Sequence, residues 1–139
     1  MSNTALAVAG DPAQLARNET LTRAFFKAWE RKDETAIVDA FAEDAFYHNV
    51  PAPFRPVVGK ESIRKAVQKF LKTGDNMTFA LNKLVIAGDS VVTERVDGWI
   101  YKGVQKSLPV MGILEFNAAG KLASWREYFD VKTMTGESA

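Results

Sequence analysis

The apolar residues of this chain change their spacing, from a helical period in most of the first half to a strand period in the second. Three segments with helical spacing are predicted as helices, at residues 12–31, 36–41 and 60–71. Five segments with strand character are predicted as strands, at residues 45–50, 77–86, 90–101, 106–116 and 121–131. Helices followed by a meander of strands are typical of an α+β fold and not of alternating βαβ units.

A length of 139 residues fits one domain with one hydrophobic core. We expect a flexible N-terminal tail at residues 1–12, a single domain at 13–133 and a C-terminal tail at 134–139. A curved sheet with helices closing one side leaves a pocket between the two layers, and such a pocket is the first place to look for a site.

Charge and composition exclude several classes of function. Eighteen basic residues nearly balance seventeen acidic ones, and a net charge of +1 favours neither nucleic acid nor a membrane surface as a partner. No apolar run approaches the roughly 20 residues that a membrane helix needs. There is no cysteine and only one histidine, which argues against a His- or Cys-rich metal site. The absence of cysteine suits a cytoplasmic protein, and we expect neither a metal nor a cofactor.

The strand predicted at residues 90–101 carries two opposite charges on one face. Because strand side chains alternate between faces, Arg95 and Asp97 point the same way as Val91 and Trp99. Burying such a pair costs several kcal/mol per ion in desolvation unless the ions are well paired. The pair is therefore either a surface ion pair on a solvated face or the charged centre of a functional site.

Two other strands offer partners for this pair. Glu127 is flanked, two residues away on each side, by an aromatic residue on its own face, which is unusual for a solvated face. Tyr47 and Asn49 share a face of the strand at 45–50 and could position a water molecule. His48 points to the opposite face, so we do not expect it to be the catalytic base. Two carboxylates beside Arg95 make a plausible acid/base pair, since the arginine holds one of them ionised.

The order of these motifs resembles the limonene-1,2-epoxide hydrolase family. The resemblance covers most of the chain, from about residue 25 to residue 131. The motifs stand here as Phe41-Ala42-Glu43-Asp44, Tyr47-His48-Asn49, Thr93-Glu94-Arg95-Val96-Asp97 and Trp125-Arg126-Glu127-Tyr128-Phe129-Asp130. The resemblance implies the cone-shaped fold shared with nuclear transport factor 2, ketosteroid isomerase and SnoaL-like polyketide cyclases. In that fold a curved, mixed or antiparallel sheet and about three helices enclose a pocket.

The resemblance also implies an activity: hydrolysis of a small hydrophobic epoxide to a diol in one step, without a cofactor or a covalent intermediate. Asp97 would be the general acid that protonates the epoxide oxygen. Glu127 would be the general base and, with Tyr47 and Asn49, would hold the attacking water. Arg95 would bridge the two carboxylates. Each acid or base term contributes roughly 10²–10⁴-fold to the rate.

An apolar wall around the substrate and a paired quaternary state complete the expectations. The substrate-binding wall is expected at Phe26, Trp29, Phe70, Trp99, Leu108, Val110 and Phe129. Relatives on this fold commonly pair through the outer face of the sheet, so we expect a homodimer. The small-molecule partners are the epoxide and water.

The chain departs from the family at the base and in the wall. The family's usual residue at the position of Glu127 is aspartate, and glutamate extends the reach by roughly 1.5 Å, one carbon–carbon bond. The wall is more aromatic than is usual in the family, which argues against limonene epoxide as the natural substrate.

Two other functions remain open from the sequence. The first is an isomerase or cyclase of the ketosteroid isomerase or SnoaL type, which would move a proton without adding water. The second is a non-catalytic protein that binds a hydrophobic ligand, although such a protein would have little use for two carboxylates beside an arginine.

Overall fold

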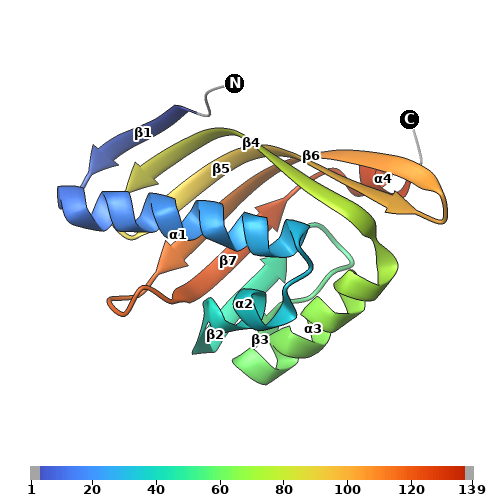
Figure 1. Ribbon diagram of the computed structural model, residues 1–139, viewed down its shortest axis with the longest axis horizontal. Coiled ribbons are helices and arrows are strands. Elements are labelled where there is room, and N and C mark those ends of the chain that lie inside the picture. Colours follow the sequence, from blue (N-terminus) through green and yellow to red (C-terminus); the bar gives the residue numbers. More distant parts are fainter. Residues whose placement is uncertain (1–3, 137–139) are drawn as a thin grey trace.

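Residues 4–136 are described by the computed structural model, and they form one seven-stranded sheet and four helices (Figure 1). The helices are α1 (Pro12–Glu30), α2 (Glu34–Asp39), α3 (Lys60–Thr73) and α4 (Val131–Thr135). The strands are β1 (Thr4–Ala9), β2 (Phe41–Asn49), β3 (Val57–Val58), β4 (Asp75–Ala87), β5 (Ser90–Tyr101), β6 (Val104–Phe116) and β7 (Leu122–Tyr128). The α+β class predicted from the sequence is confirmed.

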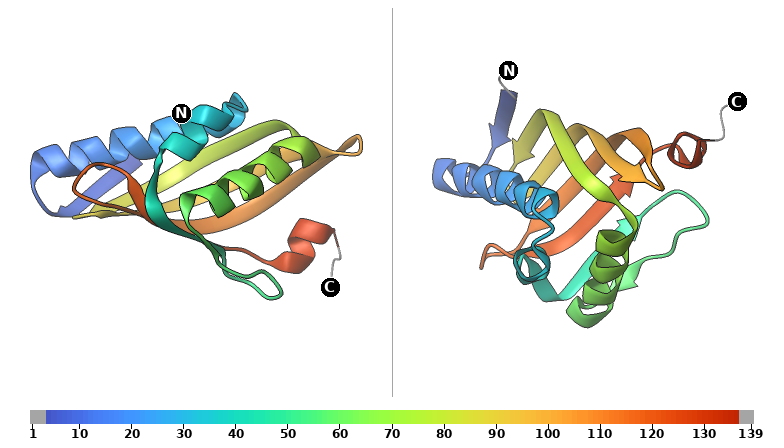
Figure 2. Two further views of the ribbon diagram at one scale, coloured as in Figure 1. Left: turned by 90° about the horizontal axis from the view of Figure 1, so that it is seen from below. Right: turned by 45° about the vertical axis from the view of Figure 1, so that its right-hand side comes forward.

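The sheet is mixed, and its strand order is β1-β4-β5-β6-β7-β2-β3. β4 to β7 form an antiparallel meander, while β1 joins β4 and β2 joins β7 in parallel. Two register shifts interrupt the pairing of β4 with β5. Such irregularities bend a strand and increase its twist. The sheet is accordingly curved, and α1, α2 and α3 lie on one side of it (Figure 2).

Helix α1 anchors this helical layer to the sheet. It begins at Pro12, and the Asp11 side chain accepts a hydrogen bond from the backbone N–H of Gln14 at 3.1 Å, so both residues favour a helix start. Its inward face buries Phe25, Phe26 and Trp29. The helix therefore covers the middle of the sheet and contributes Trp29 to the space beside it.

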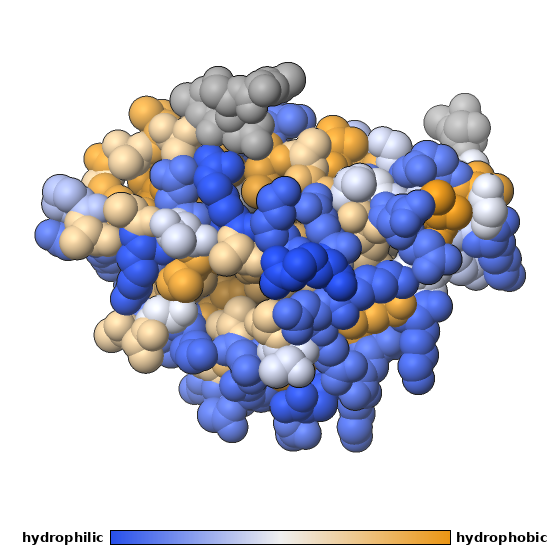
Figure 3. All heavy atoms as spheres, viewed as in Figure 1, coloured by the Kyte–Doolittle hydropathy of each residue, from blue (hydrophilic) through white to orange (hydrophobic). Residues whose placement is uncertain are grey.

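The outer side of α3 is largely polar. Figure 3 shows hydrophilic side chains over α3, with apolar patches toward β1 and toward the hairpin between β5 and β6. Within residues 4–136, no helix combines the length and the apolar character that a membrane span requires.

The predicted helices and strands are confirmed as elements, with shifted ends. The largest shift is in β2, which begins at Phe41 and not at residue 45. The short strand β3 pairs with β2 and was not predicted. A pair of residues is too short to show an alternating pattern, so its strand character comes from its partner.

The N-terminal segment differs from the expectation of a flexible tail. Residues 4–9 form β1, an edge strand that pairs in parallel with β4, from Thr4 opposite Lys83 to Ala9 opposite Ala87. The backbone N–H of Gly88 also donates to the carbonyl of Ala9 at 2.6 Å. These partners lie far along the chain, and no local pattern could reveal them. Residues 1–3 of the expected tail lie outside the described residues.

The C-terminal segment also differs. The last strand ends at Tyr128, and α4 follows because the Asp130 side chain accepts a hydrogen bond from the backbone N–H of Lys132 at 3.2 Å and caps the helix. Met134 and Thr135, which were expected in the tail, belong to α4. Residues 137–139 lie outside the described part of the chain.

Candidate active site

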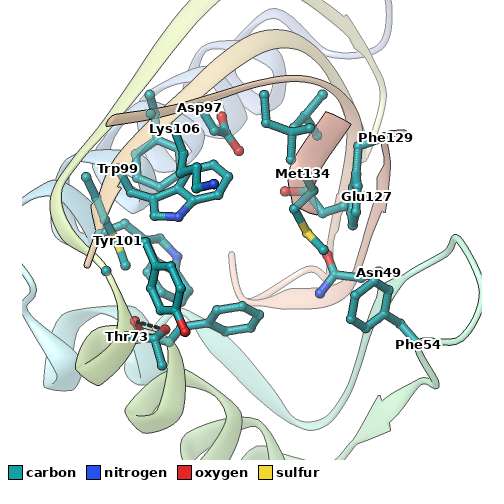
Figure 4. A pocket seen from close by; sticks show the side chains of 18 of the residues that line it. Asn49, Phe54, Thr73, Asp97, Trp99, Tyr101, Lys106, Glu127, Phe129 and Met134 are labelled. Atoms are coloured by element: carbon teal, nitrogen blue, oxygen red, sulfur yellow. Dashed lines mark hydrogen bonds between the residues drawn. The ribbon is translucent and has the colours of Figure 1, made fainter. Parts of the chain in front are cut away.

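A cavity of about 510 Å³ lies between the curved sheet and the helices. Its wall is mostly apolar, and the polar groups on it are few. It is lined by Trp29, Tyr47, Asn49, Phe54, Phe70, Thr73, Gly74, Met77, Phe79, Asp97, Gly98, Trp99, Tyr101, Lys106, Leu108, Val110, Trp125, Glu127, Phe129, Met134 and Thr135. Figure 4 shows Asp97, Glu127 and Asn49 around the same open space, although they come from three different strands. An apolar cavity with a few convergent polar groups is the usual form of a small-molecule site.

Arg95 lies beneath this wall, and its side chain is fully buried. Its Nε and Nη2 donate to the two oxygens of Asp97 at 3.0 and 2.8 Å. Its Nη1 and Nη2 donate to the two oxygens of Glu127 at 3.0 and 2.5 Å, and Nη1 also donates to Thr93 Oγ1 at 3.0 Å. A guanidinium has five N–H groups, and these five hydrogen bonds use all of them. The buried charge is thus fully paired, and the interpretation as a surface ion pair is wrong.

Phe26 completes the surroundings of the guanidinium. The Phe26 ring lies 4.5 Å from Arg95 Cζ, which is a cation–π distance. The ring is 1% exposed and does not line the cavity. The prediction that Phe26 belongs to the substrate-binding wall is therefore corrected. Helical spacing gives its inward direction, but the ring packs against Arg95 and against Phe79 and Trp125, and it is these last two that line the cavity.

Glu127 is held between two neighbouring strands. In the antiparallel pair of β6 and β7 it lies opposite Gly112, and in the parallel pair of β2 and β7 it lies opposite Asn49. A Cβ atom on Gly112 would overlap Glu127 Oε2 and would lie 2.8 Å from Arg95 Nη1. The missing side chain of Gly112 therefore provides the space in which this carboxylate meets the guanidinium. A glycine inside a strand often marks such a close approach.

Tyr47 and Asn49 extend the polar centre on the β2 side. Asn49 Nδ2 donates to the Tyr47 hydroxyl oxygen at 3.1 Å. The Tyr47 ring stacks on Trp125 with the ring centroids 4.6 Å apart. The hydroxyl oxygen thus accepts a bond from Asn49 and keeps its own proton to donate.

Burial determines the protonation behaviour of these groups. Burial raises the pKa of the Glu127 carboxyl above its ordinary value, although the charge of Arg95 opposes the rise. Burial also raises the pKa of the Tyr47 phenol, and the nearby Glu127 carboxylate adds to the effect, so Tyr47 is a neutral donor. Burial alone would lower the pKa of Arg95, but the carboxylates of Glu127 and Asp97 raise it by more. The site can therefore hold a charged arginine between two carboxyl groups of different environment.

The structure brings together all five residues predicted for the catalytic centre, namely Arg95, Asp97, Glu127, Tyr47 and Asn49. Six of the seven predicted wall residues line the cavity, namely Trp29, Phe70, Trp99, Leu108, Val110 and Phe129. His48 does not line it, and its ring contacts Phe46 on the other side of β2. Within residues 4–136, no group of three or more histidine or acidic side chains is arranged to hold a metal ion.

Several residues of the site were not predicted from the sequence. Gly112 and Lys106 share the inward face of β6 with the predicted Leu108 and Val110, so strand alternation could have identified them. Phe54 follows β2 in a loop, and its ring lies 6.1 Å from that of Phe129. No periodic signal marks a loop residue, which is why the sequence did not indicate it.

Comparison with known proteins identifies the relatives of this chain. Residues 16–139 match the family model of the limonene-1,2-epoxide hydrolase catalytic domain. Two solved structures at 23% and 17% identity have the same fold. An LEH-like epoxide hydrolase of Mycobacterium tuberculosis is 23% identical over 88% of this chain and 90% of its own, with a TM-score of 0.77. A Shewanella denitrificans protein described as a SnoaL-like polyketide cyclase is 17% identical over 91% of this chain and 97% of its own, with a TM-score of 0.79.

A third similar structure shows how widely this fold is used. It is a hypothetical protein of Catenulispora acidiphila with a ketosteroid isomerase-like fold, in complex with trimethylamine. It is 23% identical over 85% of this chain and 91% of its own, with a TM-score of 0.75. Likeness at this level of identity establishes the cone-shaped fold that the sequence predicts.

Proposed function

This chain belongs to the limonene-1,2-epoxide hydrolase family, and on that premise we propose that it adds water to a small hydrophobic epoxide and releases a diol. The observation that carries the proposal is the fully paired Arg95 between Asp97 and Glu127 at the wall of an apolar cavity. A buried ion pair of this kind adds little to folding stability, because the cost of desolvating the ions offsets much of their mutual attraction. A catalytic role explains why it is there.

In the proposed reaction, Glu127 is the general base and Asp97 the general acid. A water held near Glu127, Asn49 and Tyr47 loses a proton to the Glu127 carboxylate while its oxygen attacks an epoxide carbon. The bond between that carbon and the epoxide oxygen breaks, and the oxygen takes the proton of Asp97. When the diol dissociates, Glu127 is protonated and Asp97 is ionised. A proton returned through solvent restores the starting state.

The two carboxyl groups have different environments, and the division of roles between them follows the family resemblance. Asp97 is the more exposed, with 15% of its side chain accessible against 7% for Glu127. Burial raises the pKa of Glu127, and a raised pKa makes its ionised form a stronger proton acceptor. Arg95 favours the ionised form of both carboxyl groups, whereas burial and the repulsion between Glu127 and Asp97 favour a proton on one of them.

An isomerase or cyclase is the second candidate, and the SnoaL-like and ketosteroid isomerase-like relatives on this fold support it. The same carboxyl groups could move a proton between two positions of one substrate. Such an enzyme would have no need of a held water, whereas the neighbouring hydroxyl of Tyr47 and amide of Asn49 could hold one. This difference favours hydrolysis.

Reaction in ¹⁸O-labelled water distinguishes the two functions. A panel of epoxides of graded size is incubated with the protein, and the products are analysed by mass spectrometry. We expect a diol that carries one labelled oxygen atom. Turnover to a product without the label would contradict hydrolysis and favour the isomerase or cyclase.

Asp97→Asn tests the acid. We expect diol formation to fall by at least roughly 10²-fold, the usual contribution of a general acid, because an amide cannot supply the proton. Glu94→Gln is the matched control, since Glu94 is an exposed acidic residue on the same strand. The circular dichroism spectrum and the melting temperature should show that both variants fold. Full activity in Asp97→Asn would remove Asp97 from the mechanism.

A further inference from the structure

One cation lies on the cavity wall next to the catalytic centre, on the side of the hairpin between β5 and β6. Lys106 shares the inward face of β6 with Leu108 and Val110, and it is half-buried. Figure 4 shows its side chain turned into the cavity beside Trp99 and Asp97. A lysine is an unusual component of a wall that is otherwise mostly apolar, because its charge favours water over such surroundings.

The ammonium of Lys106 has no acidic partner among residues 4–136. No carboxylate oxygen of these residues lies within 4.0 Å of it, in contrast to the buried guanidinium of Arg95, which has two carboxylate partners. Its Nζ is 3.7 Å from the position that a Cβ on Gly136 would take, so it lies beside the end of α4. The cavity therefore contains a positive charge that the described part of the chain leaves unpaired.

The strand register places this charge relative to the reaction. Asp97 lies opposite Leu108, and Trp99 lies opposite Lys106, in the antiparallel pair of β5 and β6. Two residues along a strand span roughly 7 Å. Lys106 is thus one such step from the level of the acid, in the direction of the hairpin and of the exposed Tyr101.

We propose that Lys106 binds a carboxylate of the substrate, and that the preferred epoxide is an amphipathic acid whose carboxylate lies a short chain away from the ring. This inference rests on the proposed epoxide hydrolysis and identifies the substrate class of the same cavity. The apolar wall takes the hydrocarbon part, the centre at Asp97 and Glu127 takes the ring, and Lys106 takes the anion. A charge-assisted hydrogen bond in a partly buried place is stronger than a neutral one.

Ligand binding tests the role of Lys106 independently of catalysis. The chain has three tryptophans, and Trp29, Trp99 and Trp125 all line the cavity, so tryptophan fluorescence reports its occupancy. The probes are decanoate and decanol, which share a chain length and differ in charge. We expect the wild type to bind decanoate about tenfold more tightly than decanol, the effect of one hydrogen bond between charged groups.

Three variants make this test specific. Lys106→Met should bring decanoate and decanol to similar affinities, and Lys106→Arg should keep the preference for decanoate. Lys132→Met is the matched control, because Lys132 lies on the nearby helix α4 but does not line the cavity, and it should also keep the preference. A wild type without a preference, or a preference that survives in Lys106→Met, would overturn the role of Lys106. In that case the ammonium reaches solvent and takes no part in recognition.

Turnover then separates this inference from the proposed function. The substrates are terminal epoxy fatty acids of graded chain length, each paired with its methyl ester. We expect kcat/KM for the best acid to exceed that for its ester by about tenfold, and the ratio to fall to about one in Lys106→Met. A wild type that hydrolyses neither compound contradicts the epoxide hydrolase, while the binding experiment still decides the role of Lys106. Hydrolysis of acid and ester at equal rates leaves the hydrolase intact and overturns the substrate class.

Discussion

At the scale of single residues, the site depends on how Arg95 distributes its hydrogen bonds between Asp97 and Glu127. Arg95 uses every N–H group that it has, and four of its five hydrogen bonds go to Asp97 and Glu127. Its charge therefore interacts mainly with the two carboxyl groups and favours their ionised forms, against the effect of burial on Glu127. Glu127 differs from Asp97 chiefly in its deeper burial. Because of this burial, we expect activity to rise and folding stability to fall as the pH rises through the pKa of Glu127.

The raised pKa of Glu127 predicts a distinct pH profile. As the base, Glu127 must be ionised, so kcat/KM should rise with pH through a value above the ordinary 4.5. The contribution of Glu127 to the free energy of unfolding changes in the opposite direction with pH. Because the folded pKa exceeds the unfolded one, that contribution is complete below the unfolded pKa and is lost as pH rises through the folded pKa.

Glu127→Gln separates these effects, since the amide does not titrate. We expect kcat/KM to fall by roughly 10²–10⁴-fold and its acidic limb to disappear. Denaturant unfolding between pH 4 and pH 8 (the range is approximate) should show that wild-type stability falls relative to the variant as pH rises. An unchanged acidic limb in the variant would mean that another group is the base.

At the scale of elements, β6 connects the chemistry with the substrate. Its inward face presents Gly112, Val110, Leu108 and Lys106 in succession. Gly112 leaves room for the carboxylate and guanidinium, the two apolar residues line the cavity, and Lys106 lies toward the hairpin. The catalytic, apolar and cationic regions of the cavity therefore follow one another along β6, because every second side chain of a strand points to the same face.

Gly112→Ala should damage both catalysis and folding. The new methyl group would overlap Glu127 Oε2, so the carboxylate must leave its place on Arg95. A shift of about 1 Å can cost roughly 10²-fold in rate, and overpacking costs about 1–3 kcal/mol of stability. We expect losses of this size in kcat/KM and in the free energy of unfolding measured with urea.

Ser107→Ala is the control for this substitution. Ser107 is an exposed residue of the same strand and points to the outer face. Its replacement should leave both quantities close to those of the wild type. If Gly112→Ala behaved in the same way, the site would not depend on the space above Gly112.

At the scale of the whole molecule, the two faces of the sheet have different surroundings. The inner face carries the cavity and the helices, whereas helices α1 to α3 leave the outer face uncovered (Figure 2). Met111 and Tyr128 lie opposite each other on β6 and β7 and are about half exposed, at 47% and 48%. An exposed apolar area of this kind is compatible with the homodimer that the family resemblance implies.

We expect a dimer of this protein in solution, formed through the outer face. Met111→Glu should convert it to a monomer, because pairing would bury two unpaired carboxylates. Light scattering coupled to size-exclusion chromatography measures the mass. Val104→Glu changes an exposed apolar residue at the hairpin, 56% exposed against 47% for Met111, and should remain dimeric. A monomeric wild type, or a dimeric Met111→Glu variant, would place the interface elsewhere or exclude it.

The sequence by itself determined the order of α1 to α3 and of the five long strands, and the face of its strand on which each catalytic residue lies. Alternation within β5 is a local property of the chain, so Arg95 and Asp97 could be assigned to one face without a structure. The same reasoning assigned Glu127 on β7 and the pair Tyr47 and Asn49 on β2. Motif order then related the three strands to each other.

Only the tertiary structure decided which residues meet across strands. The pairing of β1 with β4, the position of Phe26 under the guanidinium and the space above Gly112 depend on contacts between distant parts of the chain. Periodicity gives the direction of a side chain, but register and curvature determine what it reaches. Arg95 shows both parts of this division: alternation gave the face on which it lies, and the fold supplied the five acceptors that make its burial possible.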